Sequence, residues 1–203
     1  MKNRNKDSGF TLLETVVALT VILAAVVGPM SLITRGLFNF SLAKNRVIAV
    51  NLAQEGIELI RMIRENNVAC DEKKQENGEA AWPWNSDPRG VLIPLLHVGV
   101  DVGDFSDTVS CGTVSIAFPH MSSSCFGSLL YEPGTGLPNS GMYGYSGSQQ
   151  TLFSRCVDIA APPSIPTPGI PAADQMDITS TVSWSDHGTP YAAVLKERLY
   201  NWR

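Results

Sequence analysis

The chain has 203 residues and a formal net charge of −4. Its length suggests one modest domain with appendages, and its acidic balance argues against nucleic acid as the main partner because it leaves no broad basic surface. Hydrophobic residues make up 44% of the chain, enough for a packed core.

The N-terminal region joins a short basic stretch to a long apolar run. Lys2, Arg4 and Lys6 lie in the first eight residues, whereas residues 15–34 contain no charged side chain. At a rise of 1.5 Å per residue, a helix of this length spans about 30 Å, the thickness of the hydrocarbon core of a bilayer. The pattern therefore predicts a membrane-spanning helix with Glu14 at its entrance.

The acidic side chain of Glu14 is unusual in this position. A carboxylate in the middle of a bilayer costs about 2.5–3.5 kcal/mol on insertion scales, so an acidic residue in a membrane segment indicates a functional site. The alternative is a glutamate that is tolerated because it lies near the helix end, where its side chain reaches the interface. The residues that surround Glu14 favour the functional interpretation.

The basic leader, the Gly9-Phe10 junction, the apolar run and Glu14 together resemble the class III signal of type IV prepilins and pseudopilins. In that family a membrane peptidase cuts after the glycine and methylates the new amino terminus. The resemblance implies cleavage between Gly9 and Phe10, methylation of Phe10, and a role for Glu14 in assembly. The i,i+4 spacing on a helix lets the Glu14 carboxylate approach its own new amino group, and subunit packing can offer a neighbour's amino group instead.

A conventional secretory signal peptide is the rival interpretation of the same residues. Its cleavage site would follow the apolar region, and Ala24-Ala25 is a weak candidate. However, the apolar character continues to Ile33, beyond a typical signal-peptide core. Basic residues flank the span on both sides, so charge does not fix its orientation; the orientation rests on the resemblance and on the cysteines.

Beyond Arg35 the helical pattern becomes amphipathic. We expect Gly56 to let a packed sheet approach closely, and we expect the helix to end at about Asn66. The segment 52–58 (LAQEGIE) is similar to that of minor pilins, although any long packed helix can present such a face. Spacings of three and four residues predict a buried face made of Ile48, Leu52, Gly56, Ile60 and Ile63.

The composition changes sharply after Asn67. Thirteen of the 17 glycines, 12 of the 13 prolines and all four tryptophans follow it, so we expect a loop-rich head. Trp82-Pro83-Trp84 indicates either a binding patch or, as we favour, a local cap over the core. Residues 119–150 are rich in serine and glycine and are expected to form a long surface excursion. Residues 160–173 are predicted to be a semi-rigid connector with polyproline character.

Alternating apolar residues predict strands in the head. The strongest pattern lies near the end of the chain, where one strand precedes a turn at 185–190 and another returns antiparallel over 191–202. Its core face is expected to hold Met176, Ile178, Val182 and Trp184. Weaker candidates are 91–102, 113–118 and 151–159. Pro94 and Gly99 interrupt the first of these and make it an edge or bulged strand.

Four cysteines all lie in the head: Cys70, Cys111, Cys125 and Cys156. No pair has C-x-x-C spacing and none has a histidine at a zinc-ligand interval, which argues against a zinc site. An even number of cysteines in a domain outside the cytoplasm favours two disulfides, with buried free thiols as the alternative. Three pairings are possible, and the sequence does not choose between them.

Motifs for chemistry are scarce. His97, His120 and His187 are scattered, and no glycine-rich phosphate loop is present. The aspartates at 101, 104 and 107 suggest either a calcium-binding loop or, as we favour, a solvated acidic turn. We therefore expect a protein that is not an enzyme and that needs neither a metal nor another cofactor.

These patterns predict an α+β fold in which a long N-terminal membrane-spanning helix packs on a small antiparallel β-sheet head. The expected divisions are a leader peptide at residues 1–9, a transmembrane and filament-core helix at 10–34, an amphipathic helical half at 35–67, and a loop-rich β head at 68–203.

The resemblance implies a minor pilin, a structural subunit of a type IV pilus-like filament that a prepilin peptidase processes. The alternative within the family is a type II secretion pseudopilin, and the alternative from another class is a membrane-anchored envelope adhesin or enzyme. Expected partners are other pilins, the prepilin peptidase, the membrane and the inner-membrane assembly machinery. The implied location is the bacterial inner membrane, with the head outside the cytoplasm, and then an extracellular pilus.

Overall fold

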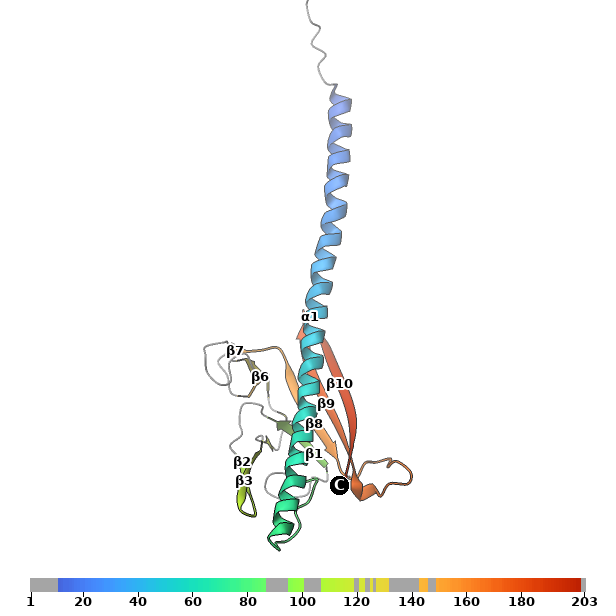
Figure 1. Ribbon diagram of the computed structural model, residues 1–203. Coiled ribbons are helices and arrows are strands. Elements are labelled where there is room, and N and C mark those ends of the chain that lie inside the picture. Colours follow the sequence, from blue (N-terminus) through green and yellow to red (C-terminus); the bar gives the residue numbers. More distant parts are fainter. Residues whose placement is uncertain are drawn as a thin grey trace, which may run out of the picture. The chain divides into compact units, whose positions relative to one another are not determined.

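The computed structural model describes residues 11–86, 95–100, 107–118, 121–122, 125, 127–131, 143–145 and 149–201. The chain divides into two compact units between Asn45 and Arg46. A single helix, α1, runs from Leu12 to Glu76 and contributes to both units (Figure 1).

In the first unit, the described residues of α1 are exposed up to Ser41, and most of them are apolar. The helix is long and apolar enough to cross a membrane, and no part of its most apolar window is buried within the protein. Hydroxyl groups in this stretch donate to carbonyls three or four residues earlier, which satisfies them inside the helix as lipid requires. These bonds measure 2.8–3.2 Å and belong to Thr15, Thr20, Ser31 and Thr34.

The second unit is built on an antiparallel sheet of five strands in the order β10-β9-β8-β1-β4. Their bounds are Leu95–Val100 for β1, Met121–Ser122 for β4, Ser154–Ala160 for β8, Gln175–Asp186 for β9 and Thr189–Tyr200 for β10. A short 3₁₀ helix, η1 (Ala172–Asp174), precedes β9. The fold is therefore α+β, as the sequence predicts.

The strands β9 and β10 form the predicted C-terminal hairpin. They pair from Asp186 with Thr189 at the turn to Gln175 with Tyr200 at the open end. Between them, His187 and Gly188 have φ angles of 49° and 80°. A two-residue type I′ turn needs left-handed backbone at both of these positions, and this turn matches the natural twist of the two strands.

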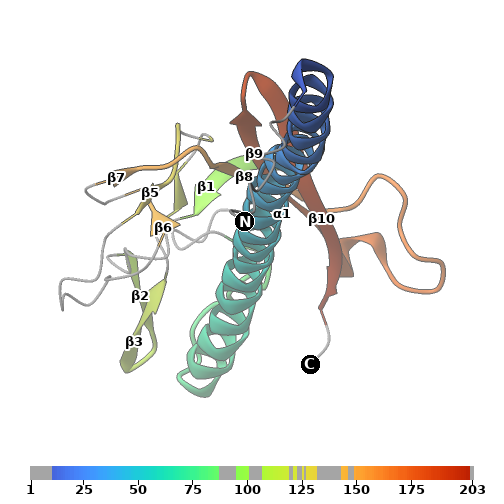
Figure 2. The same cartoon turned by 90° about the horizontal axis from the view of Figure 1, so that it is seen from above.

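Part of α1 lies across one face of this sheet, as the view from above shows (Figure 2). Two clusters of buried apolar residues join the helix to the strands. The predicted core face of β9 is confirmed, because its four residues belong to these clusters. The first includes Ile57, Ile60, Ile63, Val157, Ile159, Met176, Ile178 and Leu199. The second includes Ala49, Leu52, Ala53, Leu129, Phe153, Val182 and Trp184.

Two smaller sheets complete the described part of the head. A hairpin pairs β2 (Asp107–Cys111) with β3 (Val114–Phe118). A second sheet has the order β6-β5-β7 and lies within the predicted surface excursion. Its strands are β5 (Leu130–Tyr131), β6 (Tyr143–Gly144) and β7 (Gln149–Gln150).

Two details differ from the sequence-based expectation. The helix continues past Asn66 to Glu76, because Cys70 and Asp71 are buried and tertiary contacts override the polar composition of this stretch. The strand β1 is not an edge strand, since it pairs with β8 on one side and with β4 on the other. Pro94, which suggested an edge, lies outside the described residues.

Candidate processing and assembly site

The N-terminal end of α1 is closed by Thr11. The amide of Glu14 donates to Thr11 Oγ1 at 3.3 Å, and the amide of Thr15 donates to the Thr11 carbonyl at 3.2 Å. Thr11 is therefore the N-cap residue, and Glu14 occupies the third helical position. The T-x-x-E order is the sequence of a capping box, a signal in the sequence for the start of this helix.

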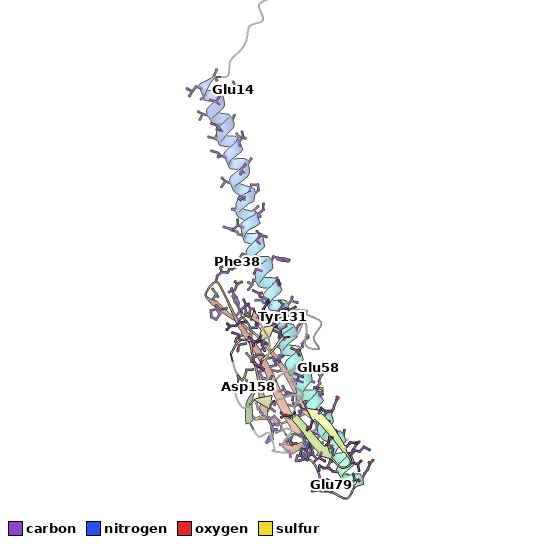
Figure 3. The ribbon with its side chains drawn as sticks, turned by 90° about the vertical axis from the view of Figure 1, so that its left-hand side faces the viewer. Glu14, Phe38, Glu58, Glu79, Tyr131 and Asp158 are labelled. Carbon is purple, nitrogen blue, oxygen red and sulfur yellow. A yellow bond between two sulfur atoms is a disulfide. The ribbon has the colours of Figure 1, made fainter. Side chains whose placement is uncertain are left out.

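The predicted processing residues lie before this cap, and the predicted assembly residue lies just after it. Gly9 and Phe10, the predicted cleavage and methylation residues, lie outside the described residues. Glu14 lies one turn into the helix and is exposed (Figure 3). Its carboxylate is near the positive end of the helix dipole, which favours negative charge there. Cleavage after Gly9 would leave Phe10 and Thr11 ahead of the first helical residue.

The apolar side chains that follow Glu14 point outward around α1 and are not covered by other parts of the described chain (Figure 3). Such an exposed surface on a long helix marks a region that lipid or other helices cover. A continuous helix also forms its backbone hydrogen bonds within itself, whether lipid or other helices surround it. The same helix can therefore lie in a bilayer or in a bundle. Its largest exposed side chains include Leu13, Ile22, Met30, Leu32, Leu37 and Phe40.

In the second unit, Gly56 is the point where α1 approaches the sheet closely. A Cβ atom at this position would lie 2.7 Å from Ser180 Oγ and 3.2 Å from Val157 Cγ2. Both distances are shorter than ordinary van der Waals contact, so the missing side chain permits this approach. The close packing predicted for Gly56 is confirmed.

Next to this contact, a buried ion pair joins the helix to β8. Arg155 Nη1 donates to Glu55 Oε2 at 2.7 Å and to the carbonyl of Leu52 at 3.3 Å. The Arg155 side chain is fully buried, whereas Glu55 keeps some exposure to solvent. Removing one partner of a buried pair costs about 3–5 kcal/mol, so this pair favours one register of segment 52–58 on the sheet.

Arg155 is not among the residues predicted from the sequence to have a specific role. The available signal was its position in an alternating strand, where Phe153, Arg155 and Val157 point to the same face. A charge at a core-facing position requires a buried partner. The partner lies about 100 residues earlier in the sequence, on α1, and only the folded chain identifies it as Glu55.

A second polar contact joins α1 to β10. Arg61 bonds through Nε to Glu197 Oε1 at 3.1 Å and through Nη1 to Glu58 at 2.6 Å, and Arg64 donates from Nε to the carbonyl of Tyr200 at 3.1 Å. The hydrogen bond with Glu197 raises the pKa of Arg61, which stays protonated at any physiological pH. Because the Arg61 side chain is well exposed, this contact orients the strand more than it stabilises the fold.

The last turns of α1 hold the segment that follows the helix. Buried Asn67 donates from Nδ2 to the carbonyls of Trp84 and Ser86 at 3.1 and 2.8 Å, and it accepts from Trp82 Nε1 at 3.0 Å. Asp71 accepts from the Trp82 amide at 2.8 Å. Trp84 lies in the first core cluster. The tryptophans therefore form the local cap that the sequence favours over a binding patch.

The four cysteines pair as Cys70–Cys111 and Cys125–Cys156. The first disulfide ties the β2–β3 hairpin to the end of α1, and the second ties the surface excursion to β8. The Cα atoms are 4.8 and 5.1 Å apart, within the usual range for a disulfide. The sequence allowed three pairings, because the spacing of cysteines along the chain does not determine which of them meet in the fold.

Comparison with known proteins identifies the N-terminal region. Residues 4–28 match the family model described as the prokaryotic N-terminal methylation motif, and this range contains Gly9, Phe10 and Glu14. No curated protein and no solved structure matches the chain. The motif implies processing by a prepilin peptidase and assembly in the membrane with other pilins. Residues 4–28 therefore match a type IV pilin-type prepilin cleavage and methylation signal.

Proposed function

We propose that this protein is a minor pilin, a non-enzymatic subunit of a type IV pilus-like filament. The observation that carries the proposal is the continuity of the methylation motif with α1. The motif supplies the processing signal, and the exposed apolar part of the helix supplies a surface for bundling. The segment 52–58, which is similar to that of minor pilins, includes Gly56, where the helix and the sheet pack closely.

The proposal gives each part of the chain a physical role. The peptidase removes residues 1–9 while the helix lies in the inner membrane, with the head outside the cytoplasm. Assembly then moves the apolar helix from lipid into a bundle of helices from other pilins. In this bundle, Glu14 pairs with the methylated amino group of Phe10 from its own chain or from a neighbour. The two disulfides suit a head that works in an oxidising compartment.

The charge pair can be tested by replacing Glu14. We expect Glu14→Ala and Glu14→Gln to leave processing largely intact, because the carboxylate lies past the cut, and to abolish incorporation into filaments. An unpaired buried charge costs about 3–5 kcal/mol, whereas removing the carboxylate regains at most about 2.5–3.5 kcal/mol in lipid. We therefore expect the cost of the unpaired amino group in the bundle to outweigh the gain in lipid, so that neither variant assembles.

The assay compares sheared filaments with membranes from cells that produce each variant. Glu65→Gln is the matched control, because Glu65 is also an exposed glutamate on α1 but lies in the second unit. Normal assembly of Glu14→Gln would show that the charge is not needed and that Glu14 is only a tolerated residue. Loss of assembly in the control as well would show that the effect is not specific to the N-terminal carboxylate.

A further inference from the structure

Two exposed cations of α1 follow its apolar run. Arg35 is the first charged residue after this run, and Lys44 lies about 14 Å further along the helix at a rise of 1.5 Å per residue. Both side chains are exposed, and neither forms a hydrogen bond or an ion pair with another described residue. Both belong to the first unit. These two charges are therefore open to a partner from outside the chain.

The sequence around the two cations offers them no acidic neighbour. Residues 15–54 contain neither aspartate nor glutamate, so no carboxylate lies one helical turn away from Arg35 or Lys44. Glutamates follow only from Glu55 onward, in the second unit, where Arg61 has an ion pair with Glu58. The positive charge of the first unit thus remains for an external anion.

The position of these cations along α1 matches the headgroups of a bilayer. The apolar run fills the hydrocarbon core, and the headgroup region adds about 5–8 Å on each side of that core. Arg35 directly follows the run, so it lies at this depth. Lys44 lies further out, and its flexible stem lets the ammonium group reach back toward the phosphates. Between them, Leu37 and Phe40 are 67% and 71% exposed, and such apolar side chains enter this interface.

The side of the membrane on which these cations lie is unusual. Lysine and arginine are normally enriched on the cytoplasmic side of a membrane span, not on the outer side. The predicted cleavage after Gly9 also removes the basic leader. Besides Glu14, the charged side chains that the first unit then keeps are Arg35 and Lys44. The processed helix therefore carries its side-chain cations only at the end of the span that leads to the head.

We propose that Arg35 and Lys44 bind the phosphate groups of anionic phospholipids in the membrane leaflet on the side of the head. Charge complementarity selects this partner, because lipid phosphates surround the helix at this depth. Each basic residue near an anionic membrane surface strengthens binding by about fivefold. The contact holds the processed chain at this leaflet until assembly withdraws the helix, a consequence that rests on the proposed function, whereas the lipid contact itself does not.

The test reconstitutes the full chain in nanodiscs with equal amounts of anionic phosphatidylglycerol and of phosphatidylcholine, which has no net charge. Native mass spectrometry then counts the lipids of each kind that stay bound. The variants are Arg35→Gln, Lys44→Gln and their combination, and Arg35→Lys keeps the charge. Lys196→Gln is the matched control, because Lys196 is an exposed lysine on β10 in the second unit. The leader cations are the same in every variant, so they do not affect the comparison.

We expect each neutral substitution to lower the ratio of bound phosphatidylglycerol to phosphatidylcholine by about two- to fivefold, and the combination to lower it further. Arg35→Lys and Lys196→Gln should leave the ratio near that of the unsubstituted chain. An unchanged ratio in the double variant, or an equal loss in Lys196→Gln, would overturn the proposal. Loss of filaments from the double variant with an unchanged ratio would assign the cations to another subunit and overturn it too.

The measurement needs no peptidase and no filament, so it separates this inference from the proposed function. A chain that shows the lipid preference but is never cleaved after Gly9 would refute the proposed function and leave the lipid contact standing. A chain that is cleaved and assembled but shows no loss of phosphatidylglycerol in the double variant would refute the lipid contact alone.

Discussion

The contact of Gly56 with the sheet makes a quantitative prediction about stability. Replacing a glycine inside a helix with alanine ordinarily stabilises a protein by about 1 kcal/mol. Here the added methyl group would lie 2.7 Å from Ser180 Oγ and 3.3 Å from Arg155 Cδ. Overpacking of a well-packed site costs about 1–3 kcal/mol. We therefore expect Gly56→Ala to destabilise the head by up to about 2 kcal/mol.

The cause of this loss can be isolated by a second substitution. Ser180→Ala removes the oxygen that the new methyl group would meet. In this background Gly56→Ala should be nearly neutral or stabilising. Alanine still has a higher helix propensity than glycine, and the atom that the new methyl group would approach most closely is gone. Single and double variants of the full chain, purified in mild detergent, would be unfolded thermally and followed by tryptophan fluorescence. The double-mutant cycle then reports the coupling between the two positions.

The outcome that would refute this reasoning is simple. If Gly56→Ala raises the unfolding temperature equally in both backgrounds, the sheet does not approach the helix closely at this position. The ion pair between Arg155 and Glu55 would then have to hold the helix without support from the glycine contact.

Two further predictions concern the head. A protein that begins near Ala43 should be a soluble, folded monomer because it lacks the apolar span, whereas one that begins near Asn67 should aggregate because its sheet is uncovered; equal solubility of the two would contradict the packing of α1 on the head. Titration of denatured, unreduced protein should find no free thiol, because each disulfide closes a loop of tens of residues and stabilises by about 3–4 kcal/mol; four free thiols would contradict both pairings.

Much of the fold could be predicted because its signals are local. A run without charge predicts the first part of α1, and spacings of three and four predict its buried face. Strict alternation from Met176 to Trp184 predicts β9 and its core side. These patterns depend only on which residues are neighbours on a helix or strand. Gly56 could be interpreted in the same way, since a glycine in an otherwise well-patterned helix suggests close packing.

The remaining features depend on contacts between distant segments. The helix reaches Glu76 because Asn67 and Asp71 bond to residues that follow it. The buried role of Arg155 depends on Glu55. The local sequence does not identify the partner of any of these polar residues. Its role becomes visible only when the fold supplies its partner.

The central claim is that residues 4–28 direct cleavage and methylation at a single junction. Its most direct test is the intact mass of the native protein isolated from cells, supported by sequencing of its N-terminus. The account predicts a mature chain that begins at Phe10 and carries one added methyl group, with two disulfides and no other change. A mature chain that begins after Ala24, or one that retains Met1, would contradict it.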